Sequence, residues 1–463
     1  MYINRLKTEL LISTAAFILA YLLSLSGLYI VSGAVLIAAA ICLMVLHIKK
    51  SGKLSDPAAY FSLSWIGGAG VSALKLSYLQ SDWSITSWLS FFLSYVCFIT
   101  AYELLKELKY RKKTVRPQGL NKPENAADPA AACVFGSGLL SAINIVMLLS
   151  IAAFILEALL LKYIPLFTVD TPHAYSYFHV SGVHYFTVSC VLVPSLSVIY
   201  AHYFKDCIKN DIRVRCSLII CLSLSLIIPL LLVSRFQLIF SVMLAAATYL
   251  NVNGGNTGFS LNKKSISCIA VLGMALIAGY VFITYERAHS IEYLKGIFEI
   301  KYEKLPIFVT QPYIYIANNF DNFNMLTMEL KEHTHGLKML FPVFALTGMK
   351  FTHPELVSFP LYVTKEELTT LTLIYDAYYD FGIPGVMAFT LLLGLVTSWL
   401  EEKLAKGGFM PVTVFVYSQI MFYLLFSFFT TWFSNPATWF YFTASLAIGI
   451  YIKITGRLFN KRL

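Results

Sequence analysis

Long apolar runs separated by short polar segments recur along the whole chain. A helix needs about 20 mainly apolar residues to cross the hydrocarbon core of a bilayer, so these runs predict about twelve transmembrane helices. The expected spans are 9–26, 29–47, 59–79, 87–105, 137–160, 182–202, 216–234, 236–252, 266–285, 382–399, 410–430 and 437–453. We therefore expect an all-α, polytopic integral membrane protein in which residues 1–463 form a single membrane domain.

The distribution of Lys and Arg predicts the orientation of these spans. With the N-terminus inside, most basic residues fall on inner segments such as 106–122 and 205–215, and the outer turns 80–86 and 431–436 contain none. This is the positive-inside pattern of membrane proteins. An even number of spans returns the C-terminus to the same side, so we expect both termini in the cytoplasm.

The N-terminus also resembles a signal peptide, because Arg5 and Lys7 precede the first apolar run. A second apolar run follows almost at once, without a convincing cleavage site between them. We therefore expect both runs to be retained as helices.

Three segments between the predicted spans are too long to be simple turns. The inner segment at about 106–136 carries several Pro and Gly residues and predicts a cytoplasmic linker. The segments 161–181 and 286–381 lie outside. The longer one is mildly acidic and rich in aromatics, which favours a folded, helical extracytoplasmic loop over a disordered linker. Its stretch 291–305 mixes apolar and charged residues, as an amphipathic interfacial helix does.

Composition supports a membrane protein and excludes several other classes. Hydrophobic residues make up 58% of the chain and charged residues only 13%, against about 25% charged in soluble domains. The net charge of +10 lies mostly in short loops, so topology explains it better than nucleic-acid binding does. The eight cysteines form no CxxC pair, and no Walker, HExxH or GxSxG motif is present. We expect no cofactor and no metal.

Arg235 is the most informative single residue. It stands between two apolar runs, at the outer membrane face in this topology. Charges in such positions usually face a cavity or a partner. One interpretation is an arginine that ends a helix and extends to the interface. The other is a phosphate ligand, because a guanidinium holds phosphate oxygens with two parallel hydrogen bonds.

The end of the long outer loop carries a second candidate group, which leads directly into the span at 382–399. Asp376 and Asp380 could cap free N–H groups of that helix, or act as a general base or a sugar ligand. Tyr378 and its neighbouring tyrosines could stack on sugar rings, or belong to the aromatic belt at the interface.

The histidines and Arg287 leave similar alternatives open. His333 and His335 form an HxH pair without a recognisable third ligand, so a base, a phosphate contact or a structural hydrogen bond is favoured over metal. His184 lies beside the outer segment 161–181. It could line the same outer cavity as the other candidate residues, or have only a structural role. Arg287 is a second candidate cation at the outer interface, or simply a partner for Glu286.

Four stretches together resemble the Wzy-type polymerases of oligosaccharide repeat units, which act in O-antigen, capsule and exopolysaccharide assembly. They are 164–167 with 182–185; Ser234-Arg235; 315–322 with His335-Gly336; and Thr372 with 378–382 and Gly385. The span number and the large outer loop between the ninth and tenth spans fit as well. One departure is Thr369, where relatives often have Asn; it puts a polar contact at this position in doubt.

The resemblance implies a glycosyltransferase in the bacterial cytoplasmic membrane that polymerises undecaprenyl-pyrophosphate-linked oligosaccharide at the outer face. A flippase and a chain-length regulator are implied as further partners. Arg235 and Arg287 would then bind pyrophosphate, because preplaced cations stabilise the charge of the leaving group. The implied catalytic residues are Asp380, Asp376 and His335, and the implied substrate-binding residues are Tyr378, Tyr315, Asp321, His184 and Thr372.

Three rival functions stay open. A flippase for the same lipid-linked unit would be expected to show repeats and a polar site at the membrane midplane. Here the midplane carries little charge apart from Lys75 and Glu157. A ligase that transfers finished polymer to another acceptor would share the donor site, and the stretch 378–382 favours the polymerase over it. A purely scaffolding protein is disfavoured by the large aromatic loop.

Overall fold

The computed structural model describes residues 2–110, 129–168, 174–254, 291–302, 304–405 and 411–460. Within these ranges the regular structure is helical, with an isolated antiparallel bridge between Ser77 and Ile300. Nine of the described helices are long and apolar enough to cross a membrane. The chain is therefore a polytopic helical membrane protein, as the sequence predicts.

The nine candidate spans correspond closely to predicted ones. They are Leu6–Leu25, Tyr29–Ser51, Ile85–Leu108, Gly136–Leu161, Val183–Tyr203, Ile212–Leu231, Arg235–Val252, Tyr375–Ala405 and Pro436–Thr455. The predicted span 410–430 contains a shorter apolar helix, Val412–Leu425, and 59–79 corresponds to a broken helix that ends at Ala73. The predicted span 266–285 and most of the linker 106–136 lie outside the described residues.

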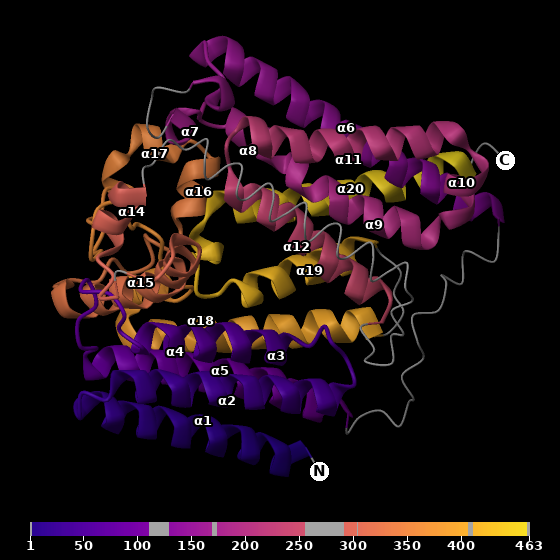
Figure 1. The fold of residues 1–463 in the computed structure, drawn as a ribbon. Coiled ribbons are helices and arrows are strands. Elements are labelled where there is room, and N and C mark those ends of the chain that lie inside the picture. Colours follow the sequence, from indigo (N-terminus) through magenta and orange to yellow (C-terminus); the bar gives the residue numbers. More distant parts are fainter. Residues whose placement is uncertain are drawn as a thin grey trace. The chain divides into compact units, whose positions relative to one another are not determined.

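The sequence predicts one membrane domain, and the contacts between backbone positions group the chain into two compact units. The first unit comprises Met1–Arg116, Ser290–Glu402 and Tyr423–Trp439. Its helices are α1 (Tyr2–Leu25), α2 (Tyr29–Ser51), α3 (Pro57–Phe61), η1 (Ser62–Ile66), α4 (Gly67–Ala73), α5 (Ile85–Tyr110), α14 (Ile291–Phe298), α15 (Ile307–Glu329), α16 (Phe341–Leu346), α17 (Met349–Thr352), η5 (Pro354–Leu356), α18 (Tyr375–Ala405) and η6 (Trp432–Ser434). In this unit α2 packs against α1 and α4, and α4 packs against α15 (Figure 1).

The segments α3, η1 and α4 follow one another without a gap, with a π-helical turn at Ser62–Ile66, and their sequence explains where they begin and how they pack. The Asp56 carboxylate caps α3 by accepting from the backbone N–H groups of Ala58 and Ala59, at 2.9 and 3.1 Å. Further along, Gly70 and Gly33 allow the backbones of α4 and α2 to approach closely. A Cβ added at Gly33 would come within 2.6 Å of the Gly70 carbonyl oxygen. Small residues thus determine how near these helices lie.

Buried asparagines on α15 hold the segment that precedes α18. The amide of Asn322 donates to the carbonyl oxygens of Leu368 and Thr370, at 2.7 and 2.9 Å. The amide of Asn319 donates to Phe428 O at 2.7 Å. Each bond gives a loop carbonyl a hydrogen-bond donor, as partly or fully buried backbone groups require. The Asn322 bonds hold the end of the 286–381 segment on α15, and the Asn319 bond holds the segment after α19 (Pro411–Leu425) there.

The helix α18 contains a sharp kink at Gly382, whose φ of 64° and ψ of −150° are not helical. This region of backbone space is essentially restricted to glycine. A second glycine, Gly385, lies where a Cβ would meet Ala377 O at 2.3 Å. The two glycines let the short first part of α18, Tyr375 to Phe381, turn against the long membrane-spanning part.

The second unit comprises Pro117–His289, Lys403–Phe422 and Phe440–Leu463. Its described helices are α6 (Pro129–Leu161), η3 (Pro165–Phe167), α7 (Ala174–Tyr177), α8 (Val183–Val188), η4 (Ser189–Leu192), α9 (Val193–Tyr203), α10 (Lys205–Asn210), α11 (Ile212–Leu231) and α12 (Arg235–Val252), with most of α19 (Pro411–Leu425) and α20 (Pro436–Asn460). Within this unit α12 packs on α9, and α6 packs on α8, α9 and α11.

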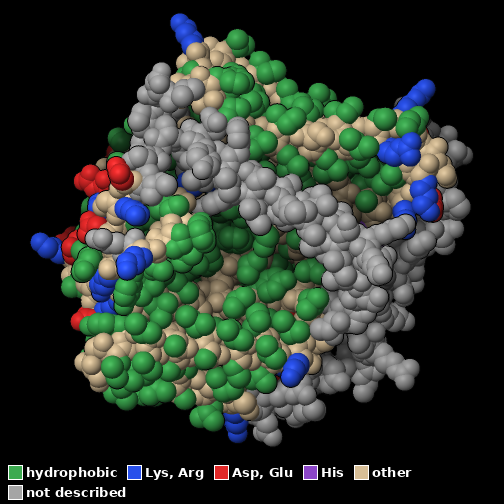
Figure 2. Space-filling model, viewed as in Figure 1, with side chains coloured by type: hydrophobic (Ala, Val, Ile, Leu, Met, Phe, Trp, Pro, Cys, Tyr) green, Lys and Arg blue, Asp and Glu red, His purple; other side chains and the backbone are tan. Residues whose placement is uncertain are grey.

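The surface of the long helices is apolar. Figure 2 shows hydrophobic side chains over most of the visible face, with Lys, Arg, Asp and Glu gathered mainly near helix ends. Many large apolar side chains on the candidate spans are exposed, among them Leu11, Leu148, Leu159 and Leu392. A soluble protein rarely exposes so much contiguous apolar surface, whereas lipid accommodates it.

Candidate functional site

A cavity of about 390 Å³ lies in the first unit beside the start of α18. Its volume falls within the range of small-molecule sites, roughly 300–1,000 Å³. The lining combines polar, charged and aromatic groups from four stretches of the chain: Leu337, Lys338, Phe341, Val357, Phe359, Leu371, Asp376, Thr431, Ser434, Asn435 and Pro436. Such a mixture suits a ligand with both hydroxyl groups and apolar ring faces.

Asp376 is the acidic group of this cavity. It is 6% exposed, and the hydroxyls of Thr431 and Ser434 lie within hydrogen-bonding reach of its carboxylate. The Lys338 ammonium is near enough to attract the carboxylate, and Asp380 is near enough to repel it. A carboxylate held in this way can accept a proton from a bound hydroxyl group.

Asp380, one helical turn further along α18, has a different environment. Its side chain is fully buried, and Oδ1 accepts from the Lys338 N–H at 3.0 Å and from the Thr334 hydroxyl. Oδ2 accepts from the Met339 N–H at 2.8 Å. Both oxygens are therefore used to hold the turn that carries Lys338 into the cavity wall. The geometry favours a positioning role for Asp380.

Lys338 supplies the positive charge of the cavity. Its ammonium lies 4.8 Å from the ring centroid of Tyr379 and 5.9 Å from that of Phe359. Cation–π contacts of this kind direct an ammonium without neutralising its charge. Lys338 can therefore bind an anionic group of a ligand, and Phe341 and Phe359 offer apolar ring surfaces beside it.

His335 and Tyr378 lie close to the cavity but outside its lining. The backbone N–H of His335 donates to Asp380 O at 3.1 Å, and its ring lies 6.3 Å from that of Phe381. The Tyr378 ring packs between Phe323 and His333. Tertiary structure thus brings Asp376, Asp380, His335 and Tyr378 close together, with Asp376 alone among them in the cavity wall.

Asp321, Tyr315 and Thr372 belong to the packed interior or its edge. The Asp321 carboxylate accepts from Ser72, Gln80 and Trp83, at 3.0, 2.8 and 3.0 Å. Burial raises the pKa of Asp321 to about 6, although these three hydrogen bonds lower it. Tyr315 is half-buried, and the Thr372 hydroxyl is buried without a hydrogen-bond partner among the described residues.

Two predicted residues, His184 and Arg235, belong to the second unit. His184 Nδ1 lies 3.2 Å from both carboxylate oxygens of Glu157, which also accept from the Thr187 hydroxyl and the Val180 N–H. Arg235 begins α12 after the capping Ser234, and it is 8% exposed. This burial argues against a side chain extended freely into the interface. Arg287 lies outside the described residues.

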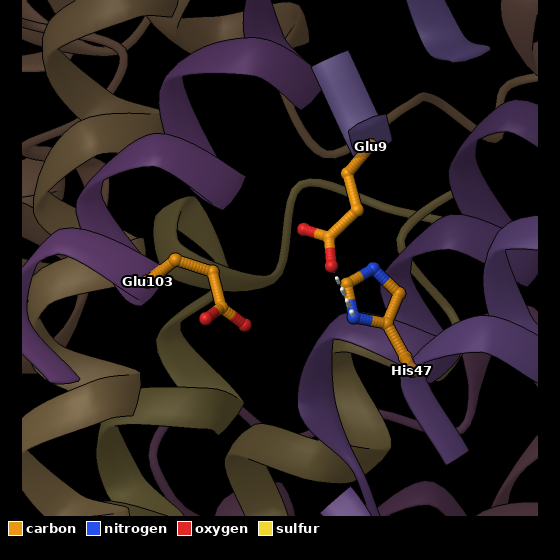
Figure 3. A group of neighbouring side chains, drawn as sticks. All are labelled: Glu9, His47 and Glu103. Carbon is orange, nitrogen blue, oxygen red and sulfur yellow. Dashed lines mark ion pairs between the residues drawn. The ribbon is translucent and has the colours of Figure 1, made fainter. Parts of the chain in front are cut away.

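A third cluster, Glu9, His47 and Glu103, has the residue types of a metal site (Figure 3). His47 Nδ1 lies 3.7 Å from Glu9 Oε1. The Lys50 ammonium, however, lies 3.3 Å from Glu9 and 2.7 Å from Glu103. A positive charge between the two carboxylates already joins α1, α2 and α5, so the arrangement is explained as an ion-pair network.

The sequence analysis missed Lys338, Thr431, Ser434 and Asn435. Lys338 carried a weak signal, because it is the one cation between His335 and Lys350. Ser434 and Asn435 form a polar pair before Pro436 in a short turn between apolar runs. Nothing in the sequence shows that this turn lies beside Asp376, which is far away along the chain. No protein-family model, curated protein or solved structure matches the chain.

Proposed function

We propose that this protein is a membrane glycosyltransferase that polymerises polyprenyl-pyrophosphate-linked oligosaccharide repeat units. The observation that carries the proposal is the cavity beside the start of α18, where Asp376 and Lys338 lie among hydroxyl, amide and aromatic side chains. The motifs shared with Wzy-type polymerases support it. In this proposal the chain lies in a bacterial cytoplasmic membrane with both termini in the cytoplasm.

The chemistry needs one base and one cation. Asp376 accepts the proton of the attacking sugar hydroxyl, whose oxygen forms the new bond to the anomeric carbon of the donor. The bond from that carbon to the pyrophosphate oxygen breaks, and the lipid pyrophosphate leaves with the electron pair. Lys338 stabilises the developing negative charge. The pyrophosphate supplies the driving force, so the reaction needs neither nucleotide nor ATP.

Neutral polar groups and aromatic rings would position the sugars. Thr431, Ser434 and Asn435 offer hydroxyl and amide groups toward the cavity, and Phe341 and Phe359 offer ring faces. Sugars present hydroxyls at their edges and C–H groups on their faces, so both kinds of side chain find partners. A cavity of about 390 Å³ accommodates a short saccharide segment rather than a polymer.

The test is an assay with purified protein in proteoliposomes. The substrate is the lipid-linked oligosaccharide that accumulates in cells lacking this gene, supplied without nucleotide sugars or ATP. A ladder of glycolipids that increase by one repeat unit is the expected result. Transfer of the oligosaccharide only to a different acceptor would identify a ligase instead. Movement of the substrate across the bilayer without any new glycosidic bond would establish a flippase.

A further inference from the structure

Five large apolar side chains of the α16–α17 segment point outward. They are Leu340, Val343, Leu346, Met349 and Phe351, with 49% of Val343 and 65% of Phe351 exposed. The opposite face of α16 is packed inside the first unit, because Pro342, Phe344 and Ala345 are buried. This segment is therefore apolar on both its buried face and its exposed face.

The apolar surface of α16 and α17 ends where polar residues follow α17. In η5 and just before it, His353 and Glu355 are exposed and paired at 3.0 Å. Glu366 and Glu367 are exposed later in the same loop. Five exposed apolar side chains thus lie together on the short α16–α17 segment, and exposed charged side chains follow it, as expected where one part of a loop meets an apolar medium.

The level of α16 relative to the membrane follows from α18. The stretch 383–400 carries no Asp, Glu, Lys or Arg, and Glu401 follows it. At about 1.5 Å per residue this stretch is roughly 27 Å long, close to the ~30 Å hydrocarbon core. The start of the stretch, next to Phe381, therefore lies near one edge of the hydrocarbon core. Phe381 itself is 48% exposed, as expected at that level.

Hydrogen bonds hold the start of the α16 segment at this level. The N–H groups of Lys338 and Met339 donate to the Asp380 carboxylate, and the His335 N–H donates to Asp380 O. Because Asp380 directly precedes Phe381, residues 335–340 lie beside the membrane edge. The outward side chains of α16 and α17 continue from there.

We propose that α16 and α17 form an interfacial hairpin whose outward apolar side chains are embedded among the lipids of the surrounding bilayer. The occupant of this surface is lipid, with acyl chains against Val343, Leu346 and Phe351. Lys350, whose ammonium lies 4.9 Å from the Phe351 ring centroid, extends toward the headgroup phosphates. The inference does not depend on the proposed glycosyl transfer, and it places the Phe341 wall of the cavity next to lipid.

The test measures contact with lipid directly. An environment-sensitive NBD label is attached to Val343→Cys or, as the matched control, Glu355→Cys, in a chain with its native cysteines replaced. Both proteins are reconstituted into vesicles of phosphatidylethanolamine and phosphatidylglycerol that contain doxyl-labelled lipid. We expect quenching by doxyl lipid at least about two-fold stronger at position 343 than at 355, and iodide quenching in the opposite order.

Equal quenching by doxyl lipid at the two positions would overturn the inference. Protection of position 343 from both doxyl lipid and iodide would also overturn it, and would indicate a covering protein. If the cysteine-free chain does not fold, a photoreactive benzoylphenylalanine at 343 or 355 in the native chain gives the second measurement. Lipid adducts at 343 and none at 355 are expected, and the reverse pattern would exclude an interfacial position.

Discussion

Asp376 and Asp380 lie one turn apart on α18, yet their side chains have different surroundings. Asp376 lines the cavity, with hydroxyl groups near its carboxylate. Asp380 is fully buried and uses both oxygens to hold the turn at 338–339. Residue type alone does not separate a base from a positioning group, because the difference lies in which partners already occupy the oxygens.

Replacing Asp376 by Asn should lower the polymerisation rate by about 100- to 10,000-fold, because the amide cannot accept the proton of the attacking hydroxyl. The melting temperature in detergent should change little, since Asn has nearly the same shape. Initial rates and thermal unfolding of the purified variant check both expectations. Glu366→Gln, in an exposed part of the loop, is the matched control. Near-normal rates for Asp376→Asn would remove this residue from the chemistry.

Replacing Asp380 by Asn should instead lower the thermal stability of the first unit. An amide offers one acceptor oxygen where the carboxylate uses two, so a buried N–H group loses its partner at a cost of about 1–3 kcal/mol. A drop in the melting temperature larger than that of Asp376→Asn is expected. Equal melting temperatures for the two variants would contradict the positioning role.

The buried Asp321 predicts a pH dependence of stability. Its pKa, raised by burial to about 6 from 3.8, means that the folded state binds more protons than the unfolded state between these values. The contribution of Asp321 to the free energy of unfolding should therefore be largest below about pH 4 and fall by roughly 3 kcal/mol as the pH rises to about 6. Melting curves from pH 4 to 8 measure it. In Asp321→Asn, the free energy of unfolding should change less between pH 4 and 6. If the variant shows the same pH dependence as the original protein, other groups cause that dependence.

At the scale of elements, glycine and asparagine determine how helices meet. Gly382 and Gly385 allow the kink that turns the Asp376 end of α18 against its membrane-spanning part. On α15, the Asn322 amide donates to Leu368 O in the loop before α18, and the Asn319 amide donates to Phe428 O in the segment after α19. The stretch 315–322 therefore includes residues whose observed contacts are structural.

Replacing Gly382 by Ala should destabilise the protein by about 1–3 kcal/mol, because its backbone conformation is essentially restricted to glycine. The new Cβ would also lie 3.2 Å from His333 Nε2. The matched control is Gly296→Ala in α14, where nothing lies within 4 Å of the added Cβ and alanine favours the helix. The melting temperatures of both variants measure this difference. Equal losses of stability in the two variants would contradict the claim that the kink requires glycine at position 382.

At the scale of the whole molecule, the apolar helices define a membrane protein, and the distribution of basic residues predicts its orientation. Lys and Arg concentrate on segments that lie on one side in the predicted topology. A green fluorescent protein fused to either terminus should therefore fluoresce in the cytoplasm. Alkaline phosphatase inserted at the exposed Ser358 should be active, because it acquires its disulfides only outside the cytoplasm.

Activity of alkaline phosphatase fused at the C-terminus would reverse the predicted orientation. Opposite locations for the two termini would mean an odd number of spans. The structure describes nine long candidates, the shorter helix Val412–Leu425 and the broken α3–η1–α4 segment. The predicted span 266–285 lies outside the described residues, so the fusions test the even number independently.

The sequence by itself determined the fold class and nearly every long helix, because hydrophobic length and the distribution of basic residues are properties of the chain alone. It also predicted the importance of the 376–385 stretch, through its acids, tyrosines and glycines. Tertiary structure decided which partners surround Asp376 and Asp380, and it made Asp321 a buried hydrogen-bond acceptor. It also placed Lys338 and Ser434 in the wall of one cavity. These depend on which distant segments meet, and local pattern contains no information on such partners.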